Sequence, residues 1–168
     1  MAISQTALVV AGSFGAALSA EDVARAIARG LRAGGLAQAD LCPIEIERSP
    51  PAKESPSPAQ TGRARRASGR PAASEWAPAP LRATTPDVAA LLAGLDFDAR
   101  MRGARAVVLA EAHLRESTLR GSVAFEIATR ARQGGVPAYA VTGENALTAF
   151  DARILDLQMI VEASSPRG

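Results

Sequence analysis

The chain has 168 residues, 48% of them hydrophobic, which is enough apolar surface for one core but short for two full domains. Only six residues are aromatic, too few for a surface that stacks nucleic acid bases. The formal net charge is +2, but residues 49–84 hold six Lys or Arg against two Asp or Glu, so the remainder is slightly acidic. We therefore expect no nucleic acid partner.

The amino-terminal residues predict no export or membrane insertion. They carry no charged leader, and their apolar run stops at Gly12, too soon for a signal peptide or a membrane span. The single cysteine, Cys42, can form no internal disulfide and is expected to be a small core residue. We therefore expect a cytoplasmic protein without a membrane partner.

Five short segments have the pattern of β-strands. The first, ALVVAG at residues 7–12, is a continuous apolar run that ends in glycine, as is typical of a strand buried on both faces. The second, residues 40–47, alternates apolar and acidic residues, and Pro43 indicates a position near the edge of the sheet. The other three strands are expected at residues 106–111, 137–143 and 157–163.

Helical periodicity separates these strands. Val23, Ile27 and Leu31 recur every four residues behind a Ser19 cap, for which Asp22 is a capping-box partner. Paired glycines at residues 34–35 and 134–135 end two of the helices. Three further helices are predicted from apolar positions: Val88, Leu91, Leu92 and Leu95 after Pro86; Leu119, Val123, Ile127 and Ala131; and Leu147, Phe150 and Ile154.

Strands that alternate with helices are joined by right-handed crossovers, which give a mostly parallel sheet between helical layers. We therefore predict a single Rossmann-like, three-layer α/β domain over residues 1–168, with residues 1–48 and 85–168 ordered. Residues 49–84 hold seven of the eleven prolines and lack periodicity, so they predict a disordered insert. We interpret this insert as a linker, with a phosphorylation or docking site at Ser68 in RARRASGR as the alternative.

The carboxyl ends of the strands are the expected place for a ligand in an open parallel sheet. This rule selects loops at residues 12–15, 111–113 and 142–145. The glycine turn at 12–15 offers backbone N–H groups to an anion, but it matches neither the P-loop nor the dinucleotide-binding pattern, and a purely structural turn is equally expected. Glu111 could bind a hydroxyl or Mg²⁺, or accept hydrogen bonds from loop amides. His113 has no second nitrogen or sulfur ligand nearby, so we expect a solvated loop histidine and no metal site.

Two stretches resemble the bacterial glycerate kinase family, which phosphorylates glycerate with ATP. VVAGSFGAALSAEDVARAIARGL, residues 9–31, is similar to that family's V-A-P-D-S-F-K-G-S-L-S-A strand, turn and helix. Residues 99–143 are similar to its region around G-E-G-R-L-D-x-Q-[ST]-x-x-G-K. The resemblance implies Ser13 and Glu111 as catalytic candidates. It also implies substrate or nucleotide binding by Gly12, Ser13, Phe14, Glu111, Thr118, Gly121 and Gly143.

The departures from the family fall on charged positions. Gly12 and Gly15 stand where the family has Asp and Lys, and so do Arg115 and Ser122 in the second stretch. The family's A-D-G-G-E-G-T stretch and its second domain have no counterpart here. Phosphoryl transfer depends on cations and carboxylates placed around the phosphate, so these losses imply reduced or lost activity. ATP and Mg²⁺ are the implied cofactors if the protein is active.

The sequence is therefore consistent with two functions. The first is a glycerate kinase-like enzyme acting on glycerate, in which an arginine such as Arg120 replaces a lost lysine, or a partner chain or second copy completes the cleft. The second is a non-catalytic nucleotide- or partner-binding remnant, because core patterning and site residues are separate parts of a sequence.

Overall fold

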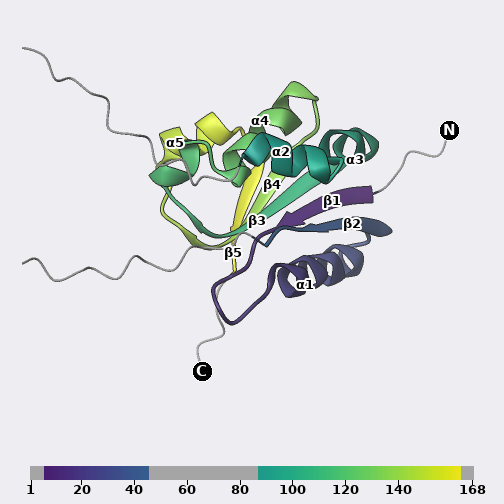
Figure 1. Cartoon of the computed structure of the whole chain (residues 1–168). Coiled ribbons are helices and arrows are strands. Elements are labelled where there is room, and N and C mark those ends of the chain that lie inside the picture. The colour runs from purple at the N-terminus through teal and green to yellow at the C-terminus, as the bar shows by residue number, and fades with distance from the viewer. Residues whose placement is uncertain (1–5, 46–86, 164–168) are drawn as a thin grey trace, which may run out of the picture. The chain divides into compact units, whose positions relative to one another are not determined.

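The computed structural model describes residues 6–45 and 87–163, which form one all-parallel sheet with helices on both faces (Figure 1). The strands lie in the order β2-β1-β3-β4-β5, as in doubly wound, flavodoxin-like sheets. The predicted α/β fold is confirmed, and the sheet is wholly rather than mostly parallel. The strands are β1 (Thr6–Ala11), β2 (Gln38–Pro43), β3 (Ala106–Leu114), β4 (Ala138–Asn145) and β5 (Met159–Glu162).

The helices are divided unequally between the two faces of the sheet. α1 (Ala20–Ala33) lies on one face, where it contacts β1 and β2. The opposite face carries α2 (Val88–Gly94), α3 (Phe97–Gly103), α4 (Val123–Gln133) and α5 (Ala149–Leu155) (Figure 1). Right-handed crossovers explain this division, because the chain steps one way from β1 to β2 and the other way in every later connection. No helix in the described ranges is long and apolar enough to cross a membrane.

The sheet separates two hydrophobic clusters. The larger lies under α2 to α5 and includes Phe97, Leu109 and Ile127, which are at most 2% exposed. The smaller lies under α1 and includes Val9, which is fully buried. Cys42 belongs to the larger cluster at 1% exposure, which confirms it as a core residue, and its burial raises the pKa of the thiol.

One helix prediction is confirmed, one needs correction, and one helix was not predicted. The helix predicted after Pro86, itself outside the described residues, is α2, which Leu95 follows directly. α3 was not predicted, and Asp96, in the left-handed conformation with φ 50°, separates it from α2. The stripe predicted to begin at Leu119 breaks, since Gly121 has φ 80°. Leu119 therefore ends the 3₁₀ helix η1 (Glu116–Leu119), and α4 begins only after the Ser122 cap.

The second predicted strand lies at the edge of the sheet, as Pro43 indicated, but ends earlier than expected. β2 ends at Pro43 rather than at residue 47. The predicted insert at 49–84, with Ser68, lies outside the described residues.

An ion pair joins α3 to the edge strand β2. Arg100 Nε and Nη2 donate to the two carboxylate oxygens of Asp40 at 2.8 and 2.7 Å, and Nη2 also donates to the carbonyl oxygen of Leu41. The hydrogen bonds from Arg100 hold the pKa of Asp40 below its ordinary value of 3.8. This pair therefore stabilises the folded state through the charged carboxylate.

We expect Asp40→Asn to lower the free energy of unfolding by about 1 kcal/mol at neutral pH, a modest value because the carboxylate is 39% exposed. Since the pKa of Asp40 is lower in the folded state, the stabilisation is present above about pH 4 and is lost as the pH falls through the folded-state pKa. Urea unfolding at pH 7 and at several acidic values will measure the difference. The two proteins should converge in stability in acid, and a constant difference contradicts the prediction.

Candidate functional site

The carboxyl edge of the sheet is extended by a two-stranded ribbon. β1 and β5 stop opposite Ala110 and Thr142, but β3 and β4 continue to pair, with His113 opposite Glu144. The loops predicted at 111–113 and 142–145 are therefore wrong, because these residues are strand. The physical reason is that burial keeps alternating beyond Glu111: Ala112 and Leu114 are 6% and 0% exposed, which extends the strand period.

His113 is solvent-exposed, as predicted, but it lies on a strand rather than in a loop. Its Nδ1 is 3.0 Å from Oε2 of Glu144, and the two side chains are 44% and 60% exposed. The pair joins the two strands of the ribbon at its outer end.

The glycine turn after β1 lies against this ribbon. Gly12 N–H donates to the carbonyl of Ala110, and Phe14 N–H donates to the carbonyl of Leu18. A Cβ built on Gly143 would lie 3.7 Å from Cδ2 of Phe14, so the structure brings the predicted residues Phe14 and Gly143 together. Ser13 lies between Gly12 and Phe14 and is partly exposed.

Gly143 and Gly12, the two predicted site glycines at this edge, differ in whether packing requires a glycine at the position. At Gly143, a Cβ would lie 2.9 Å from the carbonyl oxygen of Ala112 in the neighbouring strand, so no larger residue fits without a backbone shift. At Gly12, a Cβ would make an ordinary contact of 3.6 Å with the carbonyl oxygen of Ala110, and φ is not positive. Packing therefore explains Gly143 but not Gly12.

Glu111 and Gly12 line the same small cavity, together with Val123 and Ala124 in the first turn of α4. Its volume is about 10 Å³, at the lower limit for one water molecule. Glu111 is partly buried there and interacts within the protein. The structure thus brings these two predicted residues together, in a space too small for a substrate.

Thr118 and Gly121 build the turn that precedes α4. Thr118 is 7% exposed, and its Oγ1 accepts from the backbone N–H of Arg115 at 3.1 Å. Its carbonyl oxygen accepts from Oγ of Ser122 at 2.7 Å. The positive φ of Gly121 favours glycine. The structure of this turn therefore explains the presence of both residues without a ligand.

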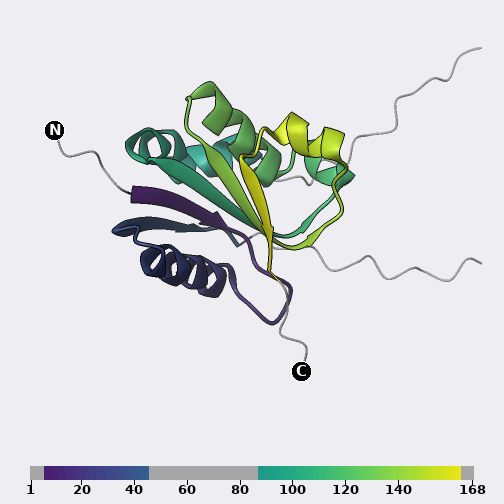
Figure 2. The same ribbon diagram turned by 180° about the vertical axis from the view of Figure 1, so that it is seen from behind.

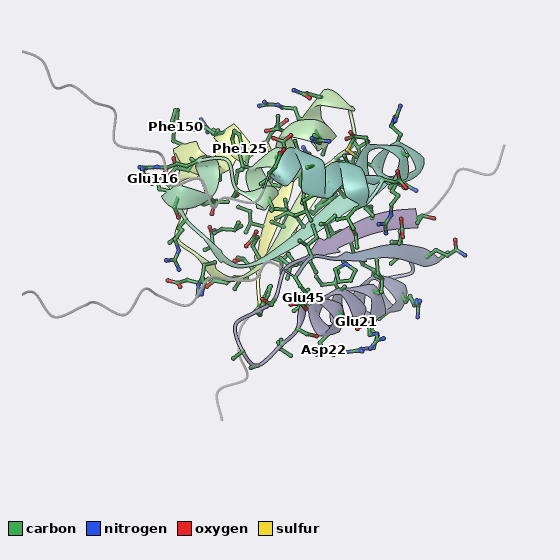
Figure 3. All side chains as sticks on the ribbon, in the orientation of Figure 1. Glu21, Asp22, Glu45, Glu116, Phe125 and Phe150 are labelled. Carbon is green, nitrogen blue, oxygen red and sulfur yellow. The ribbon has the colours of Figure 1, made fainter. Side chains whose placement is uncertain are left out.

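The glycine turn at 12–15 is the predicted anion site, and α1, the helix that follows it, has a carboxylate of this protein at its amino terminus. The backbone N–H of Ala20 donates to Oε1 of Glu45 at 3.2 Å. Ser19 caps the helix as predicted, accepting from the N–H of Asp22. Figure 3 shows Glu45 beside the start of α1, with Glu21 and Asp22 in the first turn. Glu45 was not among the predicted site residues, because the second strand was expected to continue through it to residue 47, whereas β2 ends at Pro43.

Basic groups near the second predicted stretch are not gathered into a cationic pocket. Arg120 pairs with Glu116 at 2.8 Å, and the two side chains are 75% and 73% exposed. Arg115 is exposed at the start of η1. Residues 6–45 and 87–163 contain no lysine, and within them no three or more His, Cys, Asp and Glu are arranged to hold a metal ion.

An all-parallel sheet in this strand order, with its polar residues and glycine turns at the carboxyl edge, defines a doubly wound α/β protein. The glycerate kinase family matches residues 69–165, more than half of the 168-residue chain. The chain therefore belongs to the glycerate kinase family. The match includes Glu111 and Gly143 but not the glycine turn after β1, and the roles of all these residues stay predictions. Comparisons with curated proteins and with solved structures gave no match.

Proposed function

We propose that this chain is a glycerate kinase-like protein in which ATP-dependent phosphorylation of glycerate is reduced or lost. The observation that supports this best is the Glu45 carboxylate at the amino terminus of α1. Helix amino termini bind phosphate because they present N–H groups and a partial positive charge. At α1 a carboxylate already accepts one of these N–H groups.

The charges around this helix terminus do not fit a triphosphate. Glu45 accepts from the N–H of Ala20, and Glu21 and Asp22 add two carboxylates in the first turn, of which Glu21 is paired with Arg25. Two unit charges about 5 Å apart at an effective dielectric constant of about 20 interact by about 3 kcal/mol. No lysine lies in the described ranges to offset this repulsion, and Arg120 is paired with Glu116. A triphosphate with its Mg²⁺ is therefore poorly accommodated at α1.

The site residues implied by the family fall into two groups under this proposal. Gly12, Ser13 and Glu111 are the candidates for contact with a small anionic ligand such as glycerate, because no packing requirement explains Gly12 and Glu111 lies beside it. Thr118, Gly121 and Gly143 serve first to build the turn and the ribbon. Glu111 could accept a substrate proton only after the 10 Å³ cavity that it lines opens, and Ser13 is the other candidate for this role.

The test is a coupled assay of the full chain with glycerate, ATP and Mg²⁺, beside an active two-domain glycerate kinase. We expect turnover at least about 10³-fold below that enzyme, because removing a single well-placed donor already costs about 10²–10³. Turnover at the rate of the active enzyme contradicts the proposal.

Thermal shift with each ligand alone separates the remaining alternatives. A rise in Tm with ATP, without turnover, supports the nucleotide-binding remnant. If there is neither turnover nor a change in Tm, a partner-binding role is favoured. The face of the sheet that carries α1 offers a specific surface for a partner.

A further inference from the structure

The face of the sheet that carries α1 is only half covered. α1 contacts β1 and β2, and no described helix covers β4 and β5 on this side (Figure 2). On the opposite face of β4, Ala138 and Ala140 are 3% and 0% exposed. On the α1 side, Tyr139 and Val141 are only partly buried, and Val161 of β5 is 48% exposed. The same strands are thus packed on one face and open on the other.

The open side forms an apolar groove beside α1, which none of the predicted site residues lines. The groove has a volume of about 480 Å³. Tyr139 and Val141 pair in register with Met159 and Val161, so these side chains lie on the same face of the sheet. The groove is lined mainly by apolar side chains, among them Ile27, Leu31, Val108, Tyr139, Val141 and Val161.

The width of this groove matches one helix. β3 and β5 lie two strand spacings apart, about 10 Å, and packed helices lie about 8–10 Å from each other. Gly30 of α1 lines the groove, and a Cβ there would meet nothing within 4 Å. Glycine in a helix interior is unfavourable, and the described residues give it no packing reason. Close approach of a second helix would provide one.

The charge at one end of the groove indicates the direction of that helix. Arg105 lines the groove at the amino ends of the strands, is exposed, and forms no salt bridge with a described residue. A helix that runs antiparallel to the strands, as α1 does, would place its carboxyl terminus here. That terminus carries partial negative charge, and acidic residues in its last turn would pair with Arg105.

A second copy of this chain is a poorer occupant. The strip left open is about 10 Å wide and, along the four residues of β5, about 13 Å long, whereas stable dimers bury about 800 Å² on each partner. An α1 from a second copy would also bring Asp22, Arg25 and Arg29, all exposed on its outer side, against an apolar floor.

We propose that this groove binds a single amphipathic helix of a partner protein, parallel to α1, with its apolar stripe on β4 and β5 and an acidic last turn beside Arg105. This is the helix-in-groove mode of recognition. This binding mode uses a different surface from the carboxyl-edge site, so the result of the kinase assay does not test it.

The probe is a fluorescein-labelled, designed helical peptide of about 16 residues with Leu at positions i, i+3, i+4 and i+7 and Glu in its last turn. A matched peptide has Lys in place of Glu. With the full chain, fluorescence anisotropy should show the acidic peptide binding at least about fivefold more tightly than the basic one. Arg105→Glu should reverse that order, which a merely unfolded variant cannot do.

Two further variants localise the binding. Val161→Glu places a charge on the groove floor and should weaken both peptides at least about tenfold. Phe150→Glu is the matched control, because Phe150 is 71% exposed on α5 and lies across the sheet from α1 (Figure 3). It should leave binding unchanged, with the Tm of both variants measured by circular dichroism.

Three results would overturn the proposal. They are no binding of either peptide to the unaltered chain, equal binding by the Val161→Glu and Phe150→Glu variants, and a dimer in size-exclusion chromatography that Val161→Glu converts to a monomer. The last result would identify a second copy as the occupant of the groove.

Discussion

Gly143→Ala is expected to lower the free energy of unfolding by about 2 kcal/mol. The added Cβ would lie 2.9 Å from the carbonyl oxygen of Ala112, a backbone atom of the neighbouring strand, so β3 or β4 must shift. Gly12→Ala is the matched control at the same edge. Its Cβ meets Ala110 at an ordinary 3.6 Å, so its stability should stay within about 0.5 kcal/mol of the parent. Urea unfolding measures both variants.

The contrast between the two glycines tests what the family resemblance implied for them. If Gly143→Ala were as stable as Gly12→Ala, packing would not explain Gly143, and a role in ligand binding would become the better account. If both variants were strongly destabilised, the turn after β1 would be as constrained as the ribbon. Either result would contradict the distinction drawn from the built Cβ positions.

The sequence predicted the fold well where one local pattern determined it. Continuous apolar runs marked β1 and β3, and Pro43 marked the edge position of β2, because such strands are recognised from a few adjacent residues. It failed where a single residue interrupts a pattern. Gly121, with φ 80°, separates Leu119 from α4, although the sequence predicted one apolar stripe over both.

The extent of β3 and β4 was underestimated for a different reason. Polar residues such as Glu111 and His113 look like the start of a loop, but they alternate with the buried Ala112 and Leu114. A strand that continues with one face exposed keeps this period of two. Reading the alternation past Glu111 would have predicted the ribbon.

The sequence predicted the location of the candidate site but not the contacts within it. The rule for parallel sheets selected the carboxyl edge, and the structure brings Gly12 beside Glu111 there. Glu45 was missed because its partner, Ala20, is 25 residues away in the sequence. Their contact follows only from the parallel pairing of β1 with β2, which places the residues after both strands at one edge. Nor can a sequence show how much space surrounds a glycine.

Replacement of Glu45 should strengthen the binding of ATP at the start of α1. Glu45→Ala removes a carboxylate that accepts the N–H of Ala20, so both a negative charge and a competing acceptor are lost. We expect ATP to bind the variant about tenfold more tightly than the parent chain, which is about 1.4 kcal/mol. NMR titration with ATP, followed at the amides of Ala20 and its neighbours, measures the affinity at this helix terminus.

Two controls separate the effect of charge from other effects of the Glu45 substitution. Glu45→Gln keeps an oxygen acceptor for the N–H of Ala20 but removes the charge, so it should give part of the gain. Glu21→Gln removes a charge from the same turn that is already paired with Arg25, and it should change the affinity by less than about twofold. Micromolar binding of ATP by the parent chain, with shifts at the α1 amides, would mean that Glu45 moves aside at little cost. The proposed loss of the phosphate site would then be wrong, because ATP would displace the Glu45 carboxylate from the helix terminus instead of being excluded by it.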